Sequence, residues 1–235
     1  MLCSCGANVW TPVPPPPPKP IALPKGVQSL AGARPLQPRM FDSELSVAVG
    51  GIVLGLDILI GGAQGAGKST LCAELAARMA HDLGGLAYWL DAEQNRDLVA
   101  ALFARSGSPM NRIGLISRYS EDRSTLPLTW REAFARVPRD AVVAVVDSLQ
   151  RWAPRAADQT ELLAFVRPLP FTVLVISHAT KNGQVSGRNE NQHDTDAVVV
   201  VKQTEICVTK CRWTPTPRNV RRRMKTDGEA RTTTG

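Results

Sequence analysis

The segment IGGAQGAGKST at residues 60–70 places four glycines around one lysine and two hydroxyl side chains. The spacing Gly62-x-x-x-x-Gly67-Lys68-Ser69 matches the P-loop pattern, in which backbone N–H groups face the phosphates of a nucleotide. In that pattern the lysine neutralises the β- and γ-phosphates, and the serine hydroxyl is an oxygen ligand for Mg²⁺. The predicted chemistry is therefore the binding of ATP with Mg²⁺. The residues expected to contact the nucleotide are Gly62, Ala63, Gln64, Gly65, Ala66, Gly67, Lys68, Ser69 and Thr70.

The segments on either side of this loop are those that a P-loop requires. Residues 57–60 form an apolar run typical of a buried strand. Residues 69–80 carry Leu71, Leu75 and Met79 one helical turn apart, which predicts a helix with one face in the core. A strand, a glycine-rich loop and a helix thus follow one another in the required order. The alternative is a glycine-rich turn that only caps the helix.

Acidic residues end two of the other apolar runs. Asp147 ends AVVAVVD, where a P-loop protein needs a carboxylate to hold the Mg²⁺ water shell. The alternative role of Asp147 is the N-cap of a helix that begins in DSLQ. Glu93 follows YWLDA and would orient or deprotonate the water that attacks ATP, or else serve as a first-turn carboxylate favoured by the helix dipole. Asp91 competes with Glu93 for the role of base.

Strand-like and helix-like segments alternate along most of the chain. Alternation of this kind predicts an α/β fold with a mainly parallel sheet flanked by helices. Residues 196–213 and 219–224 change the pattern to strands with short connections, which predicts antiparallel strands at one edge. The expected strands of the alternating part are 84–93, 112–117, 141–148 and 171–177, and the expected helices are 94–107, 128–137 and 159–167.

The length of 235 residues is enough for one domain of this kind with tails. We expect residues 1–39 to be an extended or disordered arm, because TPVPPPPPKPIALPKG favours polyproline II, and such an arm would be able to recruit a protein partner. We expect the ATPase domain to span 40–226 and a flexible tail to span 227–235. The apolar window at 45–62 contains Asp57 and several glycines, which argues against a membrane span and favours a buried strand with its approach.

Basic residues are concentrated at the two ends of a chain whose net charge is +7. The densest group is RNVRRRMK at 218–225, which fits a polyanion such as nucleic acid, although basic tails are also commonly only solvated. The five cysteines come without a basic-then-apolar leader. We therefore expect free thiols and a cytoplasmic location.

Several motifs together resemble the RecA-like core of the bacterial RadA (Sms) recombination ATPases. The resemblance runs from about Phe41 to Asp227. LIGGAQGAGKST is the P-loop, VVDSLQ resembles the family's VIDSIQ, and VISHATKNGQVSG resembles VGHVTKDGAIAG. YWLDAEQ stands where RadA-like proteins have a strand ending in Glu-Glu, QHDTDAVV resembles EHMVDTV, and KCRW stands in the place of KNRFG.

The resemblance implies specific roles for several residues. Glu93 becomes the catalytic glutamate, and His178 the residue that senses the γ-phosphate, although a lone histidine at a strand end is often only structural. Lys210 and Arg212, in KCRW, would reach the γ-phosphate of a neighbouring subunit, unless they are ordinary basic residues of an exposed edge strand.

The segment TKNGQVSGRNENQ at 180–192 fits the position of the family's second DNA loop. Lys181 and Arg188 would contact phosphates of single-stranded DNA there, and the alternative is a plain polar surface loop.

Three departures from the family pattern are visible. The family begins with a four-cysteine zinc module, whereas only Cys3 and Cys5 precede the proline run, so we expect no metal site there. The family ends in a Lon-protease-like domain, for which residues 228–235 are too few. The segment between Asp147 and FTVLVIS is short, which puts the family's first DNA loop in question.

The sequence as a whole favours a RecA-like P-loop ATPase that depends on Mg²⁺, forms a homo-oligomer and binds single-stranded DNA in recombination or repair. A second hypothesis is a nucleotide-switched adaptor with little ATP turnover. A small-molecule P-loop kinase ranks last, because no arginine-rich lid segment is evident.

Overall fold

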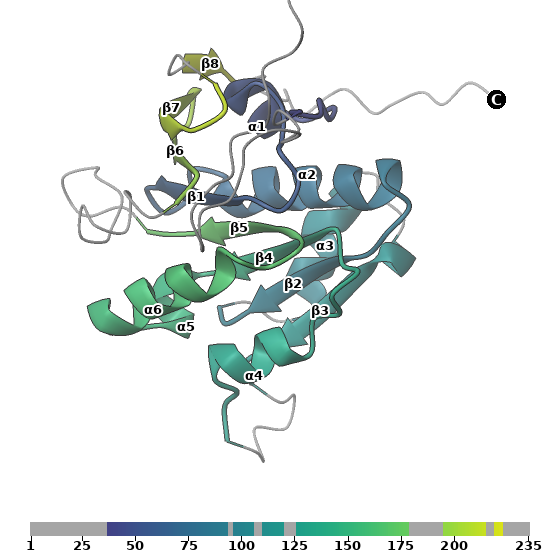
Figure 1. The fold of residues 1–235 in the computed structure, drawn as a ribbon, viewed down its shortest axis with the longest axis vertical. Coiled ribbons are helices and arrows are strands. Elements are labelled where there is room, and N and C mark those ends of the chain that lie inside the picture. The colour runs from purple at the N-terminus through teal and green to yellow at the C-terminus, as the bar shows by residue number, and fades with distance from the viewer. Residues whose placement is uncertain are drawn as a thin grey trace, which may run out of the picture. The chain divides into compact units, whose positions relative to one another are not determined.

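The computed structural model describes residues 37–93, 96–105, 110–119, 126–178, 195–214 and 219–222. In this part of the chain an eight-stranded sheet has the strand order β3-β2-β4-β5-β1-β6-β7-β8 (Figure 1). The strands are β1 (Asp57–Gly62), β2 (Ala87–Asp91), β3 (Ile113–Ser117), β4 (Val143–Asp147), β5 (Thr172–Ile176), β6 (Ala197–Val201), β7 (Glu205–Cys211) and β8 (Asn219–Arg221). Strands β1 to β6 pair in parallel, and β7 and β8 are antiparallel. The predicted α/β fold with antiparallel edge strands is confirmed.

Helices cover both faces of the sheet. One apolar cluster joins the sheet to α1, α2 and α3, and the other joins it to α4, α5 and α6 (Figure 1). Because β1, β4 and β5 lie between these two layers, every residue in them is buried, as expected for continuous apolar runs in a parallel sheet. The helices are α1 (Glu44–Val49), α2 (Lys68–Asp82), α3 (Arg96–Arg105), α4 (Trp130–Ala135), α5 (Leu149–Trp152) and α6 (Ala156–Val166).

The P-loop connects β1 to α2, and its glycines are required by geometry. Gly67 has φ of 86°, a left-handed backbone conformation that residues other than glycine rarely adopt. At Gly62, a Cβ atom would lie 2.3 Å from the carbonyl oxygen of Val201 on the neighbouring strand β6. Leu71, Leu75 and Met79 are buried on α2, so the helix has the core face that the sequence predicted.

One short helix, α1, lies where the sequence did not predict a helix, and a second, α5, begins in the segment DSLQ, which the sequence analysis gave as an alternative helix start. Helix α1 forms in the approach to β1: Ser43 caps its start by accepting from the N–H of Ser46, and Gly50, with φ of 73°, ends it. Helix α5 follows β4 directly. Both are shorter than two turns, so their apolar periodicity is hard to detect in the sequence. In the described residues, no helix combines the length and apolar character needed to cross a membrane.

Candidate nucleotide-binding site

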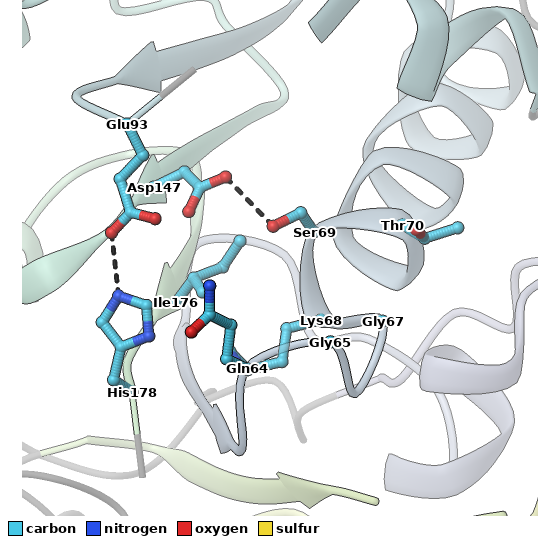
Figure 2. A pocket seen from close by; sticks show the side chains of 10 residues that line it. All are labelled: Gln64, Gly65, Gly67, Lys68, Ser69, Thr70, Glu93, Asp147, Ile176 and His178. Atoms are coloured by element: carbon cyan, nitrogen blue, oxygen red, sulfur yellow. Dashed lines mark hydrogen bonds and ion pairs between the residues drawn. The ribbon is translucent and has the colours of Figure 1, made fainter. Parts of the chain in front are cut away.

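The parallel strands bring the P-loop, Glu93, Asp147 and His178 to one edge of the sheet. Strand β2 pairs with β4 so that Asp91 lies beside Asp147, and β1 runs in the same direction before it enters the P-loop. At this carboxyl edge there is a pocket of about 270 Å³ (Figure 2). The pocket is lined by Gln64, Gly65, Gly67, Lys68, Ser69, Thr70, Glu93, Asp147, Ile176 and His178.

Lys68 is the cation of the pocket. Its Nζ donates to the carbonyl oxygens of Gly62, at 2.9 Å, and Ala63, at 2.8 Å. Burial lowers the pKa of Lys68, while the negative charges of Asp147 and Glu93 act in the opposite direction. The ammonium group is therefore held by carbonyl oxygens of the loop that would receive the phosphates.

Ser69 and Asp147 face each other across the pocket. The Ser69 hydroxyl donates to Asp147 Oδ2 at 3.1 Å (Figure 2). Burial, together with the neighbouring charges of Glu93 and Asp91, raises the pKa of Asp147 to about 7, although the Ser69 hydrogen bond acts in the opposite direction. A hydroxyl and a carboxylate are hard oxygen donors, and a dication beside them would stabilise the ionised form of Asp147. The two residues fit a Mg²⁺ site.

Glu93 is held by three neighbouring groups through the same atom, Oε1. The Ser148 hydroxyl donates to it, His178 Nε2 lies 2.8 Å from it, and Arg151 Nε lies 3.9 Å from it. Burial alone would raise the pKa of Glu93, but the contacts with Ser148, His178 and Arg151 lower it below its ordinary value. The group therefore stays ionised at neutral pH, which is the state that a base requires.

Asp91, the competing candidate, has a different position. It is buried, it accepts from the backbone N–H of Glu93 at 3.3 Å, and it does not line the pocket. The geometry thus favours Glu93 over Asp91 as the residue that faces the nucleotide. Asp91 supports the turn that carries Glu93 out of β2.

Three residues around Glu93 and His178 were missed by the sequence analysis: Ser148, Gln150 and Arg151. Ser148, and not Asp147, is the N-cap residue of α5, and its hydroxyl lies between Glu93 and His178, 3.2 Å from His178 Nε2. Gln150 accepts from the backbone N–H of His178 at 3.1 Å and donates to Ser177 Oγ at 2.8 Å. The segment DSLQ contains Ser148 and Gln150. Their position directly after a buried strand is the feature of the sequence that could have identified them as site residues.

Lys210 and Arg212 lie away from the pocket in the same chain. Lys210 Nζ donates to the carbonyl oxygen of Thr195 at 2.6 Å, and Arg212 pairs with Asp196 at 3.1 Å. Ala197 pairs with Cys211 on one side and with Ile58 on the other, so both cations are level with the start of β1, opposite the P-loop. Lys181 and Arg188 lie outside the described residues.

No protein-family model matches the chain. The chain is similar to the DNA repair protein RadA of Escherichia coli, with 27% identity over 65% of this chain and 34% of RadA. The RadA proteins of Haemophilus influenzae and Synechocystis are 28% and 29% identical over 68% and 64% of this chain, and 36% and 34% of those proteins. The chain therefore spans about a third of the length of these curated relatives.

A solved structure agrees with this result. The KaiC-like protein from Pyrococcus horikoshii superposes with a TM-score of 0.64 over 80% of this chain and 94% of that protein, at 16% identity, which is evidence for the fold. The chain carries a RecA-type core similar to that of RadA. The resemblance to a RadA-like core that was inferred from the motifs is confirmed.

The raised pKa of Asp147 predicts how the stability of the nucleotide-free RecA-type core depends on pH. The pKa rises from 3.8 to about 7 on folding, so the stabilisation is complete below pH 3.8 and is lost as the pH rises through 7. Between pH 5 and pH 8, we expect Asp147 to account for a loss on the order of 2 to 3 kcal/mol in the free energy of unfolding. Asp147→Asn should remove this part, as measured by urea unfolding at the two pH values.

The control for this measurement is Asp97→Asn, because Asp97 is an exposed acidic residue in the first turn of α3. That variant should lose stability with pH as the wild type does. An equal loss in the Asp147→Asn variant would contradict the assignment of the pH dependence to Asp147.

Proposed function

We propose that this chain is a Mg²⁺-dependent ATPase that binds single-stranded DNA and acts in DNA repair or recombination. The observation that carries the proposal is the convergence of Lys68, Ser69, Asp147 and Glu93 on one pocket at the carboxyl edge of the sheet. These residues supply a cation, metal-binding oxygens and an ionised base, which are the groups that ATP hydrolysis requires. The DNA part of the proposal is supported by the similarity to proteins named DNA repair protein RadA.

Each residue of the pocket has a proposed task. The loop amides and Lys68 would bind the phosphates, and Ser69 and Asp147 would hold Mg²⁺, which when bound supplies positive charge to the phosphate oxygens. Glu93 would accept a proton from the attacking water. His178 is held by Gln150 and lies beside Glu93, which supports its proposed role in detecting the γ-phosphate.

The remaining parts of the proposal concern assembly and DNA. We infer that the chain forms a homo-oligomer in the cytoplasm, that Lys181 and Arg188 contact phosphates of the single strand, and that the proline-rich arm recruits a protein. Lys210 and Arg212 would act on the nucleotide of a neighbouring subunit. This trans role is supported by their place opposite the P-loop of their own chain.

One observation favours the second hypothesis, a nucleotide-switched adaptor with little turnover. Glu93 Oε1 is engaged at once by Ser148, His178 and Arg151. A carboxylate held in this way would accept a proton from water through Oε2, or would first have to give up one of these contacts. If neither happens, the chain would bind ATP without hydrolysing it.

The first test is ATP hydrolysis with no DNA, with single-stranded DNA and with duplex DNA, each with and without Mg²⁺. We expect hydrolysis that requires Mg²⁺ and rises with single-stranded DNA. Lys68→Ala should abolish it, because both the bound triphosphate and the charge that develops in the transition state lose the cation of the pocket. Arg105→Ala, an exposed cation at the end of α3, is the matched control and should hydrolyse ATP normally. ATP binding without turnover under every condition would favour the adaptor.

A second test separates binding from chemistry. Glu93→Gln keeps the size of the side chain but removes the base, so ATP should bind with near-normal affinity while hydrolysis falls roughly a hundredfold or more. Asp91→Asn should reduce hydrolysis less, because Asp91 supports the backbone of Glu93 and does not line the pocket. The reverse order of the two effects would assign the base to Asp91.

A third test addresses the trans role of Lys210. Lys210→Ala and Lys68→Ala should each be inactive, and mixing them should restore some hydrolysis, since a mixed assembly contains interfaces with one intact P-loop facing one intact lysine. Pull-down with two tags would establish that the mixed assembly forms. If mixed assemblies form and no ratio restores activity, Lys210 does not act in trans.

A further inference from the structure

Arg222, directly after β8, points to the P-loop. Its Nη1 donates to the carbonyl oxygen of Ala66 in the loop. The same nitrogen donates to the carbonyl oxygen of Lys202, which lies 3.3 Å away. Its Nε lies 3.5 Å from a carboxylate oxygen of Glu44, the first residue of α1, and only 18% of the Arg222 side chain is exposed. By sequence the basic stretch 218–225 fits either a polyanion contact or a solvated tail, whereas the Arg222 side chain is directed into the protein.

The contact with Ala66 has a geometric consequence for the loop. In a trans peptide unit, the C=O group and the following N–H group point in opposite directions. When the guanidinium group holds the carbonyl oxygen of Ala66, the N–H of Gly67 must point away from Arg222. Gly67 lines the nucleotide pocket, and its N–H is one of the donors that a P-loop offers to phosphate.

A glycine at position 67 leaves room for Arg222. A Cβ atom on Gly67 would lie 2.8 Å from Nη2 of Arg222, so the arginine occupies the space that a side chain would take. Gly67 also has φ of 86°. The glycine thus permits both the left-handed conformation and the approach of the guanidinium group.

The shape of the side chain explains why an arginine suits this position. A guanidinium group is planar, carries five donors in fixed directions and stays charged, so it is able to bind two carbonyl oxygens and one carboxylate together. A lysine at position 222 would bring the same charge on a flexible stem but would not hold the three groups in fixed directions. Glu44 partly balances the charge and fixes the direction of Arg222.

We propose that Arg222 is a positioning residue of the phosphate loop, which keeps the Ala66–Gly67 peptide turned so that its N–H faces a nucleoside di- or triphosphate. The inference rests on the proposed function, because it assigns a role toward the same nucleotide. It also links the C-terminal edge strand to nucleotide binding within one chain. Arg222 acts through the loop backbone and is not itself assigned a contact with the nucleotide.

The test is the affinity of the full-length chain for fluorescent analogues of ATP and ADP in the presence of Mg²⁺. Arg222→Ala should weaken both affinities tenfold or more, and Arg222→Lys should recover only part of the loss. Arg221→Ala removes an equal charge from the neighbouring exposed position of β8 and should change the affinities less than twofold. In steady-state hydrolysis, Arg222→Ala should raise KM more than it lowers kcat, because the loop binds the phosphates in the ground state as well as in the transition state.

Thermal unfolding with and without MgADP distinguishes a positioning role from a purely structural one. If Arg222 positions the loop, the rise in Tm caused by MgADP should shrink in Arg222→Ala and in Arg222→Lys. A lower Tm with an unchanged rise would mean a structural role and would overturn the inference.

The possible results also separate this inference from the proposed function. If the wild type binds neither nucleotide, both are overturned. If the wild type binds and the Arg222 variants bind within twofold of it, only the inference fails. Should Arg222→Ala not fold, Arg222→Lys decides by the same measurements, because it keeps the charge and loses the planar contact.

Discussion

Parallel pairing of β2, β4, β5 and β1 is the constraint on which the candidate site depends, because it sends the carboxyl ends of all four strands to one edge of the sheet. Asp147 ends β4, and the P-loop, Glu93 and His178 follow the ends of β1, β2 and β5. Residues far apart in the chain therefore meet in one pocket. Apolar layers on both faces bury the strands, which leaves their register little freedom to shift.

Electrostatics at this edge is asymmetric. Asp91 and Asp147 are buried, Glu93 lies next to them, and Lys68 is the buried cation of the pocket. The pKa of Asp147 is raised to about 7 by burial, whereas the contacts of Glu93 with Ser148, His178 and Arg151 lower its pKa. The two carboxylates thus suit different tasks. A bound metal ion would stabilise the ionised form of Asp147, whereas Glu93 is already ionised, as a base must be.

The ends of the described chain also meet at the nucleotide loop. Glu44 begins α1, Arg222 follows β8, and their side chains approach each other beside Ala66. The antiparallel strands β7 and β8 therefore have a role beyond extending the sheet, since they carry Arg222 to the loop. At the other end of β1, Arg212 pairs with Asp196, next to the buried Asp57, whose pKa is raised to about 7 by burial and by Asp196. The two ends of the sheet therefore hold separate polar clusters.

The sequence by itself determined the local elements and the class of fold. The P-loop spacing, the apolar turns of α2 and the alternation of strands and helices depend on short-range periodicity, and the structure confirms a mainly parallel α/β sheet with β7 and β8 antiparallel. The sequence pattern also placed Asp147 and Glu93 at the ends of strands. The tertiary structure alone decided the strand order, the support of Glu93 by Ser148 and the turn of Arg222 toward Ala66. These contacts join residues 55 and 156 positions apart, and such distances depend on how the strands pair, which local sequence patterns do not encode.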